Sequence, residues 1–202
     1  MLTIWGRLNS HNVKKVAWAA AEMNIPHRRI DIGGQFGFTP EYLAMNPNRM
    51  IPTIEDDGFV LWESNAILRY LAHKHAPAFI SADPEERAAG DKWMDWQFHY
   101  ADAQHDAFVG LVRLPPELRN ADAIARSAEA SGAMMRILDA ELARRPWLSG
   151  QSFGIADIPM GVYAHTFYTL DISRPELPYL ADWYARLRDR QSYAEIVMIP
   201  LT

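Results

Sequence analysis

The 202-residue chain contains no cysteine. Disulfide bonds, thiolate metal ligands and a cysteine nucleophile are therefore excluded from the protein itself, and any thiol chemistry must use a thiol that a ligand supplies. Positive charge is also scarce, because 20 lysines and arginines stand against 25 aspartates and glutamates and the net charge is −5. A basic surface that binds nucleic acid is therefore not expected.

Long apolar runs are missing as well. No segment approaches the roughly 20 apolar residues of a membrane-spanning helix, and the first residues lack the apolar core of a signal peptide. We therefore expect a cytoplasmic protein without membrane association. The seven histidines are mostly scattered along the chain, so no metal site is predicted.

The first part of the chain alternates between strand and helix patterns. Strands are predicted at 2–5, 27–32, 52–55 and 59–62, and helices at 12–24, 40–44 and 65–73. The turn Asp56-Asp57-Gly58 between the last two strands predicts a hairpin. This order is typical of the α/β thioredoxin-like arrangement, in which helices cover a small mixed sheet.

Beyond a linker at 76–81, only helices are predicted. The segment Asp83-Pro84-Glu85-Glu86 has an acidic N-cap, a proline at the first helical position and Glu86 placed to reach back to the cap amide. Pro115-Pro116 should end this helix. In the next helix, small and apolar residues recur at alternating spacings of four and three, which is typical of helices packed side by side: Ile124, Ala128, Ser131, Met135, Leu138 and Leu142. We therefore expect two domains, an α/β domain at 1–77 and an all-α domain at 84–202.

The segments Ile51-Pro52-Thr53 and Glu63-Ser64 together predict a socket for a small peptide. A cis bond before Pro52 would turn the amide and carbonyl of Ile51 outward, where an extended ligand can pair with them. Ser64 is placed to cap the next helix, whose unpaired amides suit a ligand carboxylate, and Glu63 can accept from an ammonium group. A γ-glutamyl group offers both, so the expected ligand is glutathione. Serine caps and solvated glutamates also occur without any ligand.

The order of proline, strand, Glu63-Ser64 and helix after a first βαβ unit resembles the amino-terminal half of glutathione S-transferases. The resemblance extends over the whole chain and is strong to about residue 77. In this family the segment that here reads 147–158 opens the central buried helix, with Gly154 at the cap position and Asp157 in a structural role. The resemblance implies a glutathione-binding domain at 1–77, an electrophile pocket formed by 84–202, and a homodimer.

The resemblance also implies a donor to the glutathione thiolate near the start of the first helix. Branches of the family use tyrosine, cysteine or serine there, and in this chain the first tyrosine, Tyr42, comes too late. The segment Ser10-His11-Asn12 resembles the serine motif of theta-type and related bacterial enzymes, which makes Ser10 the implied catalytic donor. Asn12 could assist or replace it, and by spacing alone Ser10 merely caps the helix. Arg49 is the implied contact to the glycyl carboxylate, and His11 is expected at the surface.

The resulting interpretation is a glutathione S-transferase that adds glutathione thiolate to small hydrophobic electrophiles in detoxification. Glutathione would be the co-substrate, and no other cofactor is expected. The alternatives are a glutathione-dependent peroxidase, isomerase or dehalogenase on the same fold, or a non-catalytic protein that binds glutathione, apolar ligands or a partner. Aromatic and histidine side chains could line the electrophile pocket, although core packing also explains most of them: Tyr100, His105, Phe108, Tyr163, Phe167 and Tyr168.

Overall fold

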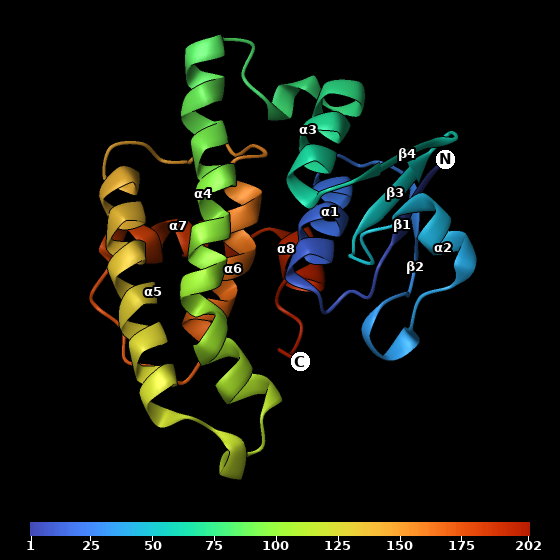
Figure 1. Cartoon of the computed structure of the whole chain (residues 1–202). Coiled ribbons are helices and arrows are strands. Elements are labelled where there is room, and N and C mark those ends of the chain that lie inside the picture. The colour runs from blue at the N-terminus through green and yellow to red at the C-terminus, as the bar shows by residue number, and fades with distance from the viewer.

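A four-stranded mixed sheet forms one side of the molecule in the computed structural model, which describes residues 1–202 (Figure 1). Its strands are β1 (Leu2–Trp5), β2 (His27–Ile30), β3 (Thr53–Asp56) and β4 (Phe59–Trp62), in the order β2-β1-β3-β4. Strand β2 runs parallel to β1, whereas β3 is antiparallel to both β1 and β4. The α/β arrangement predicted for this part of the chain is confirmed.

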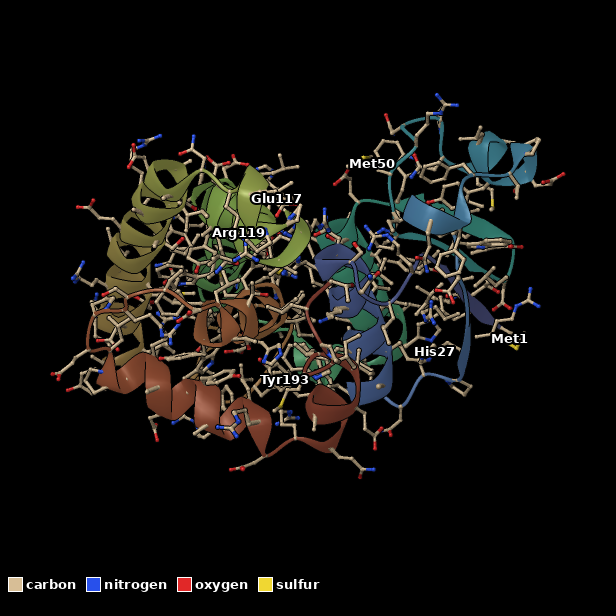
Figure 2. The ribbon with its side chains drawn as sticks, turned by 90° about the horizontal axis from the view of Figure 1, so that it is seen from below. Met1, His27, Met50, Glu117, Arg119 and Tyr193 are labelled. Carbon is tan, nitrogen blue, oxygen red and sulfur yellow. The ribbon has the colours of Figure 1, made fainter.

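Three helices accompany the sheet: α1 (His11–Glu22), α2 (Pro40–Met45) and α3 (Ser64–His75). Helix α1 is enclosed almost all round, since every residue from Val13 to Ala20 is buried. It packs against α3 and also against two helices from the end of the chain, α6 (Asp157–Thr169) and α8 (Gln191–Ile196). Seen from below, α1 lies between the sheet that carries His27 and the helices near Arg119 (Figure 2).

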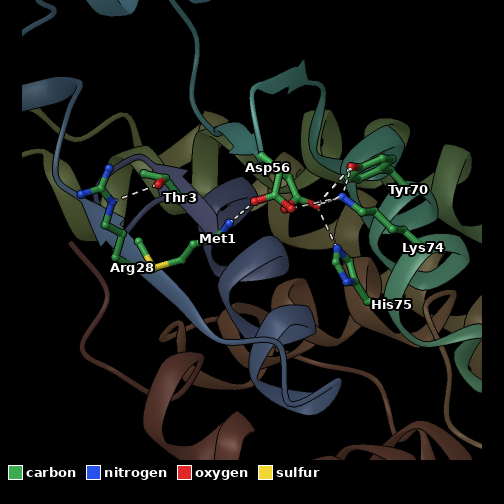
Figure 3. Close-up of polar contacts among 8 residues, drawn as sticks. Met1, Thr3, Arg28, Asp56, Tyr70, Lys74 and His75 are labelled. Carbon is green, nitrogen blue, oxygen red and sulfur yellow. Dashed lines mark hydrogen bonds and ion pairs between the residues drawn. The ribbon is translucent and has the colours of Figure 1, made fainter.

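The hairpin of β3 and β4 is fastened to α3. The hairpin predicted from Asp56-Asp57-Gly58 is present, and its turn residues Asp57 and Gly58 both have positive φ. Asp56 at the end of β3 hydrogen-bonds with Tyr70 Oη (3.1 Å), Lys74 Nζ (2.8 Å) and His75 Nε2 (2.9 Å) of α3 (Figure 3). Burial alone would raise the pKa of Asp56, but these hydrogen bonds outweigh it and lower the pKa to about 2. The contacts fix the position of α3 on the sheet.

The remainder of the chain is helical. Helix α4 (Pro84–Phe108) continues into a π-helical turn, and α5 (Ala121–Leu142) packs alongside α4. Helix α6 lies in the centre with every residue from Asp157 to Phe167 buried, and α7 (Pro178–Arg188) packs against α5 and α6. None of these helices is both long and apolar enough to span a bilayer. The predicted fold class is confirmed.

One predicted capping contact and one predicted helix start need correction. Asp83 caps α4 as predicted, but the carboxylate of Glu86 accepts from Ser81 Oγ (2.9 Å) instead of the Asp83 amide, because Ser81 already takes that amide (3.2 Å). Helix α6 begins at Asp157 and not directly after Gly154, since a tight turn precedes it in which the Asp157 amide donates to the Gly154 carbonyl (3.1 Å). The carboxylate of Asp157 does accept from the Gly154 amide (3.2 Å), as the sequence indicated.

Candidate functional site

A small hollow lies between the start of α1, the loop before β3 and the start of α3. Its lining includes most of the residues predicted to bind glutathione or act on it: Asn12, Ile51, Pro52, Glu63 and Ser64. Residues that the sequence analysis did not single out complete it: Asn46, Asn48, Met50 and Trp62. Two predicted site residues, Ser10 and Arg49, do not line this hollow.

The loop before β3 presents unpaired main-chain groups to the hollow. The Ile51–Pro52 bond is cis, as predicted, and neither the amide nor the carbonyl of Ile51 hydrogen-bonds within the protein. The loop is held from behind, because Tyr42 Oη (2.5 Å) and Asn46 Nδ2 (3.1 Å) both donate to the Met50 carbonyl. The two groups of Ile51 are therefore positioned by the fold and free to pair with an extended ligand.

The start of α3 is left open at the same hollow. Glu63, not Ser64, occupies the N-cap position, and Ser64 is the first helical residue, which corrects the cap predicted from the sequence. No side chain caps the helix, so its first amides are available to an anion. Glu63 has φ of 72°, a conformation that costs a non-glycine residue about 1–3 kcal/mol and that clusters at ligand sites. Glu63 is exposed and forms no ion pair.

The start of α1 carries the two candidate thiolate donors. Ser10 is at the N-cap position with an extended backbone, but its hydroxyl makes no capping hydrogen bond. Asn12 lines the hollow, and its Oδ1 accepts a hydrogen bond from Ser64 Oγ (3.3 Å). The Ser10 hydroxyl is thus uncommitted, whereas Asn12 is already connected to the start of α3.

Arg49 lies on the loop between α2 and β3, with φ of 59°. Its side chain is exposed, and Asn48 rather than Arg49 lines the hollow. Asn48 is held there by Asn46, whose Oδ1 accepts from the Asn48 amide (3.1 Å). The sequence offered Arg49 as the basic residue of this loop but gave no sign that Asn48 would face inward.

His11 is half-buried and in contact with the helical bundle, so the expectation of a simple surface histidine was wrong. Its ring stacks on Tyr163 of α6, with ring centroids 4.7 Å apart, and meets the edge of Phe108 of α4 at 4.9 Å. Its Nε2 hydrogen-bonds with Thr166 Oγ1 (2.7 Å). Burial, and then nearby positive charges, lower the pKa of His11 to about 3. The helices from the second half of the chain cover this residue, which local sequence around His11 cannot reveal.

The residues considered for the electrophile pocket fall into different environments. Phe108 and Tyr163 contact His11 and therefore lie close to the start of α1. Tyr100 and Phe167 belong to the buried core, and the side chain of His105 is exposed. Phe108 and Tyr163 thus contact the residue that stands between the two candidate thiolate donors in the sequence.

Lys15 is a site residue that the sequence analysis missed. Its side chain is buried behind Ser64, and its Nζ donates to Ser64 Oγ (3.4 Å), Asn65 Oδ1 (3.5 Å) and Gln97 Oε1. Burial lowers the pKa of Lys15 to about 7, and the charge of Glu63 opposes this shift. The available signal was the pair Lys14-Lys15 within a helix whose other central residues are apolar.

A larger hollow lies between α5 and the segment 171–175. None of the predicted site residues lines it. Two of its arginines serve the backbone: Arg119 donates to the carbonyls of Leu111 and Leu114, and Arg174 to those of Phe167 and Leu170. Both arginines therefore have a structural role, because they satisfy carbonyls at helix ends. The smaller hollow is the better candidate for a ligand site.

Comparisons with known proteins agree with this choice of site. The family model described as the amino-terminal domain of glutathione S-transferases matches residues 9–74, which include all the lining residues of the smaller hollow. Glutathione S-transferase GstB of Escherichia coli K12 is 40% identical over 208 residues, which cover 100% of both chains. The chain belongs to the glutathione S-transferase family.

Two further similar proteins extend the comparison. A theta class glutathione S-transferase from Xanthomonas axonopodis pv. citri, solved with glutathione bound, superposes with a TM-score of 0.96 and 48% identity, over 100% of this chain and 99% of that one. The disulfide-bond oxidoreductase YfcG of Escherichia coli K12 is 29% identical over 201 residues, covering 93% of this chain and 90% of the relative. The family and the fold predicted from the sequence are confirmed.

Proposed function

We propose that the protein conjugates the thiolate of glutathione to small hydrophobic electrophiles. The observation that carries this proposal is one hollow that contains both the unpaired main-chain groups of Ile51 and the uncapped start of α3. Glutathione needs both, because its backbone can pair with Ile51 while its glutamyl carboxylate meets the amides of α3 and its ammonium meets Glu63. The similarity to a theta class enzyme with bound glutathione supports the same ligand.

Ser10 and Asn12 are the proposed donors to the thiolate. The thiol of free glutathione, like that of cysteine, has a pKa of about 8.5, and hydrogen bonds to the anion lower it. The hydroxyl of Ser10 is uncommitted, and the Oδ1 of Asn12 already accepts from Ser64, which leaves the Asn12 amide group free to donate. Arg49 is exposed and unpaired, and we propose that it contacts the glycyl carboxylate.

Residues 1–77 would form the glutathione-binding domain and residues 84–202 the electrophile pocket of a cytoplasmic homodimer. The edge strand β4 supports a dimer, since it exposes 48% of Phe59 and 39% of Trp62, and Phe98 of α4 is 44% exposed. A second copy would cover this apolar area. Sedimentation velocity would contradict the dimer if the protein remained monomeric at micromolar concentration.

The test compares four reactions at one glutathione concentration: conjugation of an activated aryl chloride, reduction of an organic peroxide, reduction of a disulfide, and dehalogenation. Glutathione affinity is measured separately by calorimetry. We expect glutathione binding and conjugation with release of chloride, and a weaker glutathione affinity in Ser64→Ala than in the exposed control Ser152→Ala. Binding without any turnover would favour the non-catalytic alternative.

Disulfide reduction is the second candidate function, because one relative is named a disulfide-bond oxidoreductase. Since the chain has no cysteine, both electrons would come from two glutathione molecules, which end as glutathione disulfide. Disulfide reduction that clearly exceeds conjugation in the four-reaction comparison would favour this candidate.

A further inference from the structure

Lys15 places an amino group inside the protein without an ion pair, and Glu63, the one acid whose charge raises the Lys15 pKa, acts on it without direct contact. Its side chain is 0% exposed. Its ammonium group donates only to the neutral oxygens of Gln97, Ser64 and Asn65, and the ring of Phe98 lies 5.5 Å away. Burial of an ion is strongly unfavourable unless a counter-charge compensates it.

The neighbouring Lys14 shows what a purely structural lysine looks like on the same helix. Lys14 is also buried, and its Nζ donates to the carbonyl of Val197 (2.9 Å), the C-cap residue that follows α8. A cation at the carboxyl end of a helix is favourable because of the partial negative charge there. No helix end accounts for Lys15, whose charge points instead to the back of the candidate site.

We propose that Lys15 is a positioning residue that selects the glutamyl α-carboxylate of glutathione, an inference that rests on the proposed function. Ser64 Oγ accepts from Lys15, so its own proton must point elsewhere, and it now points to Asn12 Oδ1 (3.3 Å) in the lining of the hollow. A carboxylate that enters the hollow takes this hydrogen bond in place of Asn12. Lys15 then supplies the counter-charge from directly behind Ser64.

The charges around the hollow match a γ-glutamyl group as a whole. Glu63 is exposed beside Ser64 and suits the ammonium group, while Lys15 lies behind Ser64 and suits the carboxylate. The ammonium and carboxylate groups of the ligand are bonded to the same carbon. Glu63 and Ser64 are likewise adjacent in the chain, so the two pairs of groups match in spacing. The site therefore requires both charges of the ligand, and a peptide that lacks the carboxylate leaves Lys15 unpaired.

The experiment uses a ligand that differs from glutathione only in this carboxylate, namely 4-aminobutyryl-Cys-Gly. Calorimetry measures the affinity of both ligands for the wild type, Lys15→Met and the control Lys14→Met. We expect the wild type to prefer glutathione by about tenfold or more, and Lys15→Met to lose about tenfold affinity for glutathione but almost none for the analogue. Lys14→Met should keep the wild-type preference.

Two further readouts separate positioning from a general structural effect. The Michaelis constant for glutathione should rise in Lys15→Met while kcat at saturating glutathione stays within about twofold. The melting temperature of Lys15→Met should equal or exceed that of the wild type, because the substitution removes an unpaired buried charge. Lys15→Gln, which keeps a polar group without the charge, provides the same comparison if the methionine variant does not fold.

Equal weakening of both ligands in Lys15→Met would overturn the inference, and so would unchanged affinity for both. Either result would leave the proposed function standing, because the wild type would still bind glutathione. A wild-type protein that binds neither ligand would overturn the proposed function and this inference with it.

Discussion

Ser10 and Asn12 are close in sequence but differ in what they can contribute to a thiolate. The Ser10 hydroxyl makes no hydrogen bond, whereas Asn12 is already joined to Ser64. If Ser10 is the main donor, Ser10→Ala should remove about 2–4 kcal/mol of thiolate stabilisation and slow conjugation about a hundredfold. Ultraviolet titration of the enzyme-bound thiolate measures this change, because the midpoint should move upward in Ser10→Ala.

Two variants control the titration. The exposed Ser152→Ala should keep the wild-type midpoint, and Ser10→Ala should keep its stability, since the hydroxyl does not cap α1. A midpoint that moves only in Asn12→Ala would transfer the catalytic role to Asn12.

The site residues that were predicted correctly are those whose position follows from a short stretch of sequence. Ile51-Pro52 and Glu63-Ser64 each lie next to a strand or helix end, so local patterns predicted their place in the hollow. His11 and Lys15 are different, because their environments come from distant parts of the chain. His11 contacts a residue 155 positions away and Lys15 one 82 positions away, and no local pattern records such contacts.

At the scale of elements, the helix starts also divide into those that local sequence determines and those that packing determines. The cap at Asp83 was predicted correctly because an N-cap side chain bonds to amides only two and three residues later. The starts of α3 and α6 were misplaced, since each follows a turn whose shape depends on packing: the positive φ of Glu63 and the turn at 154–157. Composition alone did not specify either turn.

The turn before α6 depends on one buried carboxylate. Asp157 accepts from the amides of Leu148 (2.8 Å), Ser149 (3.2 Å) and Gly154 (3.2 Å), and from Trp183 Nε1 (2.9 Å). Asp157→Ala would leave these buried donors without an acceptor, so we expect the free energy of unfolding to fall by roughly 3 kcal/mol or more. Urea denaturation monitored by circular dichroism measures the loss.

Asp182→Ala is the matched control for Asp157. Asp182 is exposed on α7 and pairs with Arg186 one turn later, so its removal should change the stability by less than about 0.5 kcal/mol. Equal effects of the two substitutions would contradict the structural role of Asp157.

At the scale of the whole molecule, His11 joins the start of α1 to the helical bundle. Its ring is held by Tyr163 and Thr166 of α6 and by Phe108 of α4. His165, also on α6, hydrogen-bonds with Tyr184 of α7 (2.9 Å). Burial lowers the pKa of His11 to about 3 and that of His165 to about 4, with nearby positive charges as the next cause in both. Both rings are therefore neutral in the folded protein near pH 5 and 6.

This neutrality predicts how stability depends on pH. In the unfolded chain a histidine binds a proton below about pH 6.5, whereas His11 and His165 stay neutral until the pH approaches their folded pKa values of about 3 and 4. Their contribution is complete above pH 6.5 and is lost as the pH falls. Each histidine should contribute a slope of up to about 1.4 kcal/mol per pH unit between pH 6 and 4.5.

His11→Phe tests the share of this slope that belongs to the contact between α1 and the bundle. Phenylalanine keeps an aromatic ring against Tyr163 and Phe108 but binds no proton, so the slope between pH 6 and 4.5 should fall by about half. Urea unfolding at a series of pH values measures it, with the exposed His105→Gln as the control that keeps the full slope. An undiminished slope in His11→Phe would contradict the low pKa of His11 in the folded protein.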